Sequence, residues 1–251
     1  MRVSFKCFRA LENTMHKLYG EEAGYPHVEN SPQDSTVTII TAQSGLHAMA
    51  AVGLQRSTED GLRTEVTNYG RGDLFSRFIP IQDMLLNERD DQSNLSVKKP
   101  DGGLLYEKDG LLTIVAVIEI GVSESFARLK TDLRRWMDEF HCHTGILFSL
   151  KEKPKFRYPG QAAMTRYSAN DAVPFNNAMT EMLLQGHSSN VGLTVADLFP
   201  HDEEDIQGIE NLLIRFDAAR VQNLLASGAL RTAVTRFNNA IRLDNTGPQH
   251  F

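Results

Sequence analysis

The chain has 251 residues, of which 41% are hydrophobic and 23% charged, and its formal net charge is -6 at pH 7. This length and composition suit one large globular domain or two small ones, and they exclude a collagen-like or wholly disordered chain. The negative net charge argues against binding nucleic acid over the whole surface but leaves room for a local basic patch. Two cysteines cannot form a disulfide framework, so we expect a reducing compartment.

No segment of the sequence has the length and hydrophobicity of a membrane span or signal peptide. The most apolar stretch, residues 111–121, is far shorter than the roughly 20 apolar residues that cross a bilayer, and it contains Glu119. We therefore expect a soluble intracellular protein, cytoplasmic or nuclear, with no membrane partner.

The first hundred residues contain few strongly patterned segments. The β-branched residues 36–41 predict a strand, and apolar residues at helical spacing predict a short helix over 42–54. Residues 62–68 alternate between apolar and polar and predict another strand. Residues 87–99 are highly polar, so we predict a solvated loop there.

The middle of the chain predicts a β-hairpin with a buried second strand. Residues 103–106 form a strand candidate, and Asp-Gly within residues 108–110 favours a tight hairpin turn. Residues 111–120 are almost entirely aliphatic, without polar alternation, which is typical of a central strand covered on both faces.

An amphipathic helix and another strand follow the hairpin. We predict a helix over residues 123–140, capped by Ser123 and with Trp136 in the core. Residues 144–150 predict the next strand. A strand-helix-strand unit of this kind normally places its two strands parallel and adjacent.

The last third of the chain is mostly helical in pattern. Residues 176–184 and 193–199 predict short helices. Two longer amphipathic helices are predicted over 209–226 and 229–243, separated by Ser227-Gly228. We predict that residues 1–200 form an α/β core and that residues 201–251 form a C-terminal helical segment packed on it.

Two acidic residues stand out by their position in this pattern. Asp101 opens the predicted hairpin, and Glu119 ends the buried strand. A carboxylate in an aliphatic strand is costly unless it is paired or bound to a metal. If the two strands pair, both carboxylates meet at one edge of the sheet, where they suit Mg²⁺ or Mn²⁺. In the alternative interpretation, Asp101 only forms a turn and Glu119 is solvated or paired with Arg134.

These residues resemble the PD-(D/E)xK nuclease superfamily. The resemblance consists of Pro100-Asp101, then Glu119 ending an aliphatic strand, then an amphipathic helix. Residues 117–137 are also similar to a restriction-endonuclease-like group of uncharacterised fungal proteins. The resemblance implies an α/β (α+β) fold with a mixed central sheet flanked by helices. It also implies metal-dependent hydrolysis of phosphodiester bonds in nucleic acid, with Asp101 and Glu119 as catalytic metal ligands.

The chain departs from the superfamily pattern at one position, because Gly121 stands where the motif lysine is expected. We expect Lys130, on the following helix, to replace it as the catalytic lysine, with Lys151 as second choice. In the alternative interpretation, Lys130 is an ordinary lysine at the edge of a helix. If neither lysine reaches the site, the chain is a catalytically silent nuclease-fold protein that binds nucleic acid or protein. A third option is an assembly module built on the C-terminal helices.

A local excess of positive charge gives the nuclease interpretation some support. Residues 127–157 contain eight basic and four acidic side chains in a chain that is acidic overall. Clustered cations are what phosphate binding requires, although a solvated basic rim explains them equally well. The predicted partner is DNA or RNA, and the oligomeric state stays open, with a homodimer as one option. The predicted nucleic-acid-binding residues are Arg134, Arg135, Lys151 and Lys153.

Overall fold

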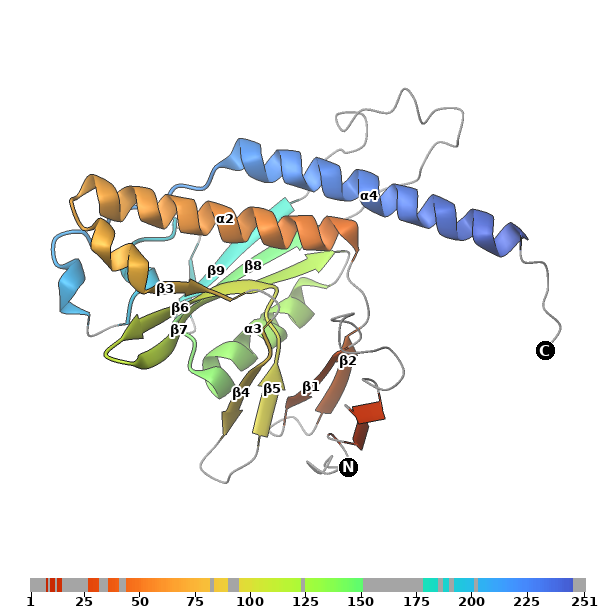
Figure 1. Ribbon diagram of the computed structural model, residues 1–251, viewed down its shortest axis with the longest axis horizontal. Helices are drawn as coiled ribbons and strands as arrows, with labels where there is room; N and C mark the ends of the chain where they lie inside the picture. The colour runs from red at the N-terminus through yellow and green to blue at the C-terminus, as the bar shows by residue number, and fades with distance from the viewer. Residues whose placement is uncertain are drawn as a thin grey trace.

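The computed structural model of the chain describes residues 8, 10–11, 13–14, 27–31, 36–40, 44–81, 84–89, 95–122, 125–150, 178–184, 187–189, 192–200 and 203–245. Within these residues, two β-sheets and three long helices make up most of the molecule (Figure 1). The fold is therefore mixed α+β, with helices on both faces of a mixed sheet, in agreement with the predicted mixed central sheet flanked by helices.

The larger sheet has six strands in the order β10-β9-β8-β7-β6-β3. Neighbouring strands are antiparallel except for β7 and β8, which are parallel. The strands are β3 (Phe78–Pro80), β6 (Gly102–Lys108), β7 (Leu111–Val122), β8 (Thr144–Leu150), β9 (Ala178–Leu184) and β10 (His187–Ser189). The helix predicted over residues 176–184 is thus wrong where the structure describes it, because these residues extend the sheet beside β8.

The predicted hairpin is confirmed as β6 and β7, and its turn explains the pairing of the two strands. Asp109 and Gly110 form a two-residue turn with φ angles of 54° and 79°. Both angles suit the tight hairpin turn that Asp-Gly favours. The buried middle and end of β7 agree with its aliphatic sequence.

The predicted crossover is also confirmed, because helix α3 (Phe126–Phe140) connects the parallel strands β7 and β8. The cap differs from the prediction. Ser125, rather than Ser123, caps the helix, and its side chain accepts a hydrogen bond from the backbone N–H of Arg128 at 3.3 Å. Ser123 lies outside the described residues.

Helices α2 (Gly45–Asn68) and α4 (Ala218–Asn245) lie side by side on the face of the large sheet opposite α3 (Figure 1). The strand predicted over residues 62–68 is wrong, because these residues are the last turns of α2. Leu54, Leu62 and Val66 are buried at helical spacing, and this stripe faces the core.

Helix α4 is continuous through Gly228, where we predicted a break between two helices. A Cβ atom on Gly228 would lie 2.8 Å from the carbonyl oxygen of Gly45, so this glycine serves close packing of α4 on α2. Residues 209–217, predicted as helix, instead form turns and an isolated bridge between Thr194 and Leu213. Three short helices of the described residues are 3-10 turns, named η1 (Gly72–Arg77), η4 (Ala196–Leu198) and η5 (Glu204–Ile206).

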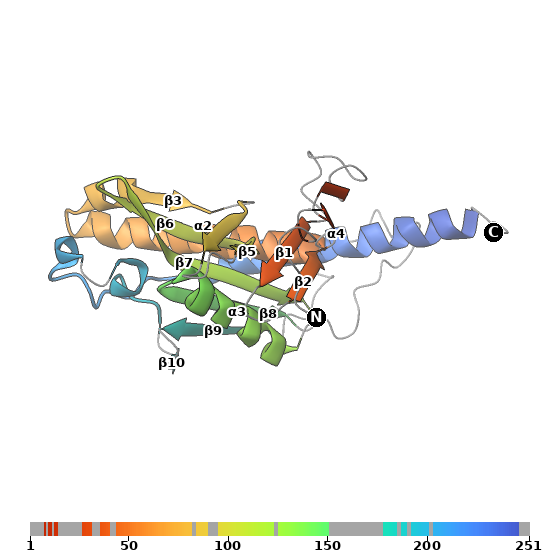
Figure 2. The same cartoon turned by 90° about the horizontal axis from the view of Figure 1, so that it is seen from below.

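A smaller antiparallel sheet lies beside α3, with the strand order β2-β1-β5-β4 (Figure 2). Its strands are β1 (His27–Ser31), β2 (Thr36–Ile40), β4 (Leu86–Arg89) and β5 (Leu95–Lys98). The strand predicted over residues 36–41 is confirmed as β2. The solvated loop predicted over 87–99 is wrong for β4 and β5, because β5 pairs on both sides and buries Val97 and Lys98.

The hydrophobic core lies on both faces of the large sheet. The larger cluster fills the space between the sheet and helices α2 and α4, and a second one lies between the sheet and α3. Trp136 is fully buried in the second cluster, which confirms its predicted place in the core. Among the described residues, no helix has the length and hydrophobicity to cross a membrane.

Candidate functional site

The two predicted metal ligands are brought together by the register of β6 and β7. Gly102 pairs with Ile118, so the residues one position further along, Asp101 and Glu119, lie opposite each other. Because alternate side chains of a strand share a face, Glu119 lies on the same face of β7 as Val117, which packs under α3. The site therefore lies at the end of the hairpin remote from its turn.

Glu119 is buried among charged and aromatic neighbours. Its Oε1 accepts a hydrogen bond from Nζ of Lys98 at 2.7 Å and another from the indole N–H of Trp136. Burial, opposed by the attraction of Lys98 and reinforced by the charge of Asp101, raises the pKa of Glu119 to about 7. Both hydrogen bonds go to Oε1, and nothing in the described part of the chain donates one to Oε2.

Lys98 is the residue of this site that the sequence analysis missed. Burial acts to lower the pKa of Lys98, but the negative charges of Glu119, Glu29 and Asp132 outweigh it and raise the pKa. Its ammonium also lies 4.8 Å from the centre of the Trp136 ring. The available signals were the apolar-polar alternation around Val97 and the closeness of Lys98 to Asp101 in sequence, but the polarity of the segment hid both.

Asp101 is held by the backbone of β7 and by the start of α2. Its Oδ2 accepts a hydrogen bond from the N–H of Ile120 at 2.8 Å, and Nε2 of His47 lies 2.8 Å from the same oxygen. His47 lies in the first turn of α2, where its backbone N–H donates to the capping side chain of Ser44. Elements on both faces of the sheet therefore contribute to the site.

Gly121, the position of the expected motif lysine, is closely packed. It lies on the same face of β7 as Glu119, and a Cβ atom added there would lie 2.3 Å from Cδ1 of Leu129 on α3. Leu129 is buried and belongs to the cluster under α3. A longer side chain at this position would displace that core residue.

A second group of buried charges ties the small sheet to α3. Arg135 donates from Nε to Oε1 of Glu139 at 3.3 Å, and Ser31 donates to the same oxygen at 2.6 Å. Glu29 lies 4.0 Å from Arg135 and accepts the backbone N–H of Lys99 at 3.2 Å. These contacts fix the end of β5 against α3, so they also fix the position of the neighbouring Lys98.

The predicted lysine and the predicted phosphate-binding residues lie in different surroundings. The ammonium of Lys130 is 5.0 Å from the centre of the Phe126 ring. Arg134 is exposed on α3, as a surface cation should be. Arg135 is only 8% exposed and pairs with Glu139, so it belongs to the interior rather than to a surface patch. Two further predicted residues lie outside the described residues, namely Lys151 and Lys153.

The carboxylates of Asp101 and Glu119 suit a hard divalent cation. Mg²⁺ is commonly held by one or two carboxylates with water in its other positions, so two such ligands meet the minimum. The two carboxylates are close enough for the charge of Asp101 to raise the pKa of Glu119. A cation between them would offset that repulsion. No group of three or more acidic, histidine or cysteine side chains suited to a metal occurs among the described residues.

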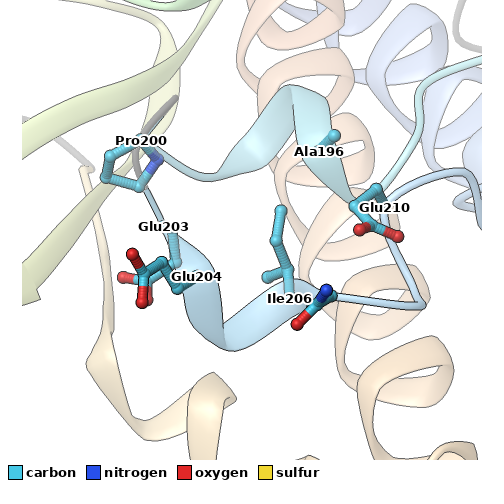
Figure 3. Close-up of a pocket in the computed structure, with 7 residues that line it drawn as sticks. Ala196, Pro200, Glu203, Glu204, Ile206 and Glu210 are labelled. Atoms are coloured by element: carbon cyan, nitrogen blue, oxygen red, sulfur yellow. The ribbon is translucent and has the colours of Figure 1, made fainter.

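A separate pocket of about 570 Å³ lies between η4 and η5 (Figure 3). Figure 3 shows the carboxylates of Glu203 and Glu204 close together on one wall and that of Glu210 on the opposite side. Glu203 is already bonded to Tyr106 and Lys108. The full lining comprises Ala196, Pro200, Glu203, Glu204, Ile206, Gln207 and Glu210.

No protein-family model matches the chain, and no curated protein sequence matches it. A functional assignment therefore depends on the chemistry of the residues described above.

Proposed function

We propose that the chain is a metal-dependent phosphodiesterase that cleaves nucleic acid, with Asp101 and Glu119 holding Mg²⁺ or Mn²⁺. The proposal includes the restriction-endonuclease-like fold implied by the resemblance to the PD-(D/E)xK superfamily. The observation that carries it is the position of Asp101 and Glu119 at the same end of β6 and β7, one residue beyond the Gly102–Ile118 pair, with the buried Lys98 beside Glu119.

Three features of Glu119 and its partner Lys98 favour a functional role over a purely structural one. Glu119 is 9% exposed, in a strand whose other buried positions are aliphatic residues or glycine. Its pKa is raised to about 7 by burial, and such displaced values are frequent at functional sites. A buried ion pair contributes little to stability compared with hydrophobic residues of the same volume. The buried pair of Lys98 and Glu119 is therefore better explained by a chemical role than by a contribution to stability.

The secondary structure around Asp101 and Glu119 is also consistent with the resemblance. Asp101 immediately precedes β6, Glu119 lies near the end of β7, and the amphipathic helix α3 follows. These are the relative positions in the sequence on which the resemblance depends.

The reaction is the displacement of a sugar oxygen from phosphorus by water. The oxygen of water forms a bond to phosphorus and the bond to the leaving oxygen breaks. The leaving oxygen keeps the electron pair and takes up a proton, while the attacking water loses one. A bound divalent cation supplies a Lewis acid that polarises the phosphate and lowers the pKa of water. The protein holds the ligands, through His47 and the N–H of Ile120 for Asp101 and through Lys98 and Trp136 for Glu119.

The test is an incubation of the whole chain with plasmid DNA, single-stranded DNA and RNA, each with Mg²⁺, Mn²⁺ or EDTA. We expect cleavage that needs the metal and that Glu119→Gln reduces by at least about a hundredfold, because loss of a charged ligand removes stabilisation of the transition state. Glu203→Gln is the matched control, because Glu203 is also buried and bonded to a lysine, and it should cleave normally. Cleavage that survives EDTA or Glu119→Gln would contradict the proposal.

Binding of the metal can be followed without activity, because Trp136 is the only tryptophan of the chain and donates to Glu119. Terbium binds oxygen ligands, and tryptophan within a few ångströms sensitises its luminescence. We expect sensitised luminescence from the wild-type protein that Mg²⁺ competes away and that Glu119→Gln abolishes.

One observation favours a second function, that of a silent binding protein. Each of the two carboxylates already has two protein partners, so protein groups satisfy one oxygen of each carboxylate without a metal. In that case the same incubation gives binding of nucleic acid or protein without cleavage, and terbium luminescence is absent.

A further inference from the structure

The fold has no space for a lysine on β7 beside Glu119. Residue 121 lies on the correct face of the strand, but Leu129 fills the volume that its side chain would occupy. A positive charge for this site must therefore come from another element.

The small sheet supplies a positive charge at that place. β5 ends at Lys98, whose ammonium lies 2.7 Å from Oε1 of Glu119. Its side chain is only 3% exposed, so water screens its charge weakly. Asp101 follows three residues later, so one short segment of chain brings both the cation and the first carboxylate to the site.

We propose that Lys98 supplies the positive charge that stabilises the reacting phosphate at the Asp101–Glu119 site, a role that rests on the proposed phosphodiesterase function. Negative charge grows on the phosphate oxygens as water attacks, and a fixed ammonium in a weakly screened environment stabilises that charge without reorganisation. We assign this role to Lys98 in place of Lys130, the lysine expected from the sequence, whose ammonium lies 5.0 Å from the centre of the Phe126 ring.

The surroundings of Lys98 keep its ammonium fixed rather than free to fold back into solvent. The ring of Trp136 lies on one side of it and Glu119 on another. Glu29 holds the next backbone N–H of the segment, and Arg135 lies beside Glu29. A preorganised charge of this kind is what electrostatic stabilisation of a transition state requires.

The experiment compares Lys98→Gln and Lys98→Arg with Lys130→Gln, which removes the rival lysine expected from the sequence, all in the whole chain. Lys98→Gln keeps a hydrogen-bond donor for Glu119 but removes the charge, whereas Lys98→Arg keeps the charge. Rates are measured at saturating Mg²⁺ on the substrate that the wild-type chain cleaves, below the melting temperature of each variant. Terbium luminescence sensitised by Trp136 reports whether the metal site is intact.

We expect Lys98→Gln to lower kcat by about a hundredfold with little change in KM, the scale seen when one preorganised stabilising group is removed. In Lys98→Arg, kcat should fall by no more than about tenfold, and Lys130→Gln should cleave like the wild type. All three should bind terbium. If Lys98→Arg does not fold, the comparison of Lys98→Gln with Lys130→Gln tests the role of Lys98.

Three results would overturn the role of Lys98. They are normal cleavage by Lys98→Gln, an equal loss in Lys98→Arg and Lys98→Gln, and a loss in Lys130→Gln as large as that in Lys98→Gln. In each case wild-type cleavage and its dependence on Glu119 still support the phosphodiesterase function. Absence of metal-dependent cleavage by the wild type overturns the function itself and the role of Lys98 with it.

Discussion

Two glutamates of this molecule are each bonded to a lysine, yet the pKa of their carboxyl groups moves in opposite directions. Glu119 accepts from Lys98 at 2.7 Å, and Glu203 accepts from Lys108 at 3.0 Å. Burial raises the pKa of Glu119 to about 7. Burial also acts to raise the pKa of Glu203, but hydrogen bonds, chiefly from Tyr106 and Lys108, outweigh it and lower the pKa.

The difference lies in the partners rather than in the residue type. Lys98 is 3% exposed, so both members of its pair have lost their hydration. Lys108 is 45% exposed, and Glu203 gains further donors in Tyr106 and the backbone N–H of Asp205. A lysine near a carboxylate therefore does not by itself indicate a stabilising salt bridge. The balance between lost water and gained hydrogen bonds decides the direction of the shift.

The largest expected effect is the loss of stability when Lys98 is replaced, measured against the replacement of Lys108. Lys98→Met leaves Glu119 buried beside no cation, and breaking a buried pair in this way costs about 3–5 kcal/mol of unfolding free energy. Lys108→Met should lower the unfolding free energy much less than Lys98→Met does, since its ammonium is 45% exposed and Tyr106 and the N–H of Asp205 still donate to Glu203. Urea denaturation followed by circular dichroism measures both. Equal losses in the two variants would show that the pairs are alike after all.

A pH titration should separate the two glutamates next. The pKa of Glu119 is raised in the folded chain, so the folded state binds a proton more tightly than the unfolded state between about pH 4.5 and pH 7. The contribution of Glu119 to stability is therefore complete below pH 4.5 and is lost as the pH rises through about 7. Glu203, with a lowered pKa, contributes above the ordinary glutamate range and loses that contribution in acid.

The fluorescence of Trp136 measures this titration, because its indole N–H donates to Glu119. We expect a transition with a midpoint near pH 7 that Glu119→Gln removes and Glu203→Gln leaves in place. A transition that persists in Glu119→Gln would assign the change to another group.

The smallest expected effect concerns the hydroxyl of Tyr106. Tyr106→Phe removes one donor to Glu203, which keeps Lys108 and the N–H of Asp205, so the unfolding free energy should fall by about 1 kcal/mol. The pKa of Tyr106 is itself raised to about 12, chiefly by burial, and absorbance at high pH in the wild type should show that delayed ionisation. A loss as large as that of Lys98→Met would mean that Glu203 depends on a single donor.

The sequence predicted the parts of the fold whose patterns were strong. The aliphatic run of β7, the Asp-Gly turn and the stripe of α3 lead directly to the hairpin and crossover, because burial on two faces and helical spacing leave few alternatives. The strand predicted over residues 62–68 is wrong, because the apolar residues of this short alternating segment also continue the buried stripe of the long helix α2. Gly228 predicts the end of a helix, but glycine also allows close packing between helices, and that is its role here.

Two of the residues of the candidate site could also be predicted from the sequence. Asp101 and Glu119 could be chosen because one opens a hairpin and the other ends a buried strand. Lys98 could not, because its strand is only four residues long within a polar segment, and Lys98 becomes buried only when β1, β5 and α3 pack together. The contact between Lys98 and Glu119 depends on packing between two sheets, and no local pattern encodes it.

The short connection between the two sheets has a mechanical consequence. Only Lys99 and Pro100 separate Lys98 from Asp101, and the proline ring restricts rotation of that backbone. The small sheet and the hairpin are therefore joined through the candidate site itself. Any displacement of one sheet relative to the other changes the distances between the charges of Lys98, Asp101 and Glu119. A partner that binds the small sheet would therefore alter the site without contacting the two carboxylates.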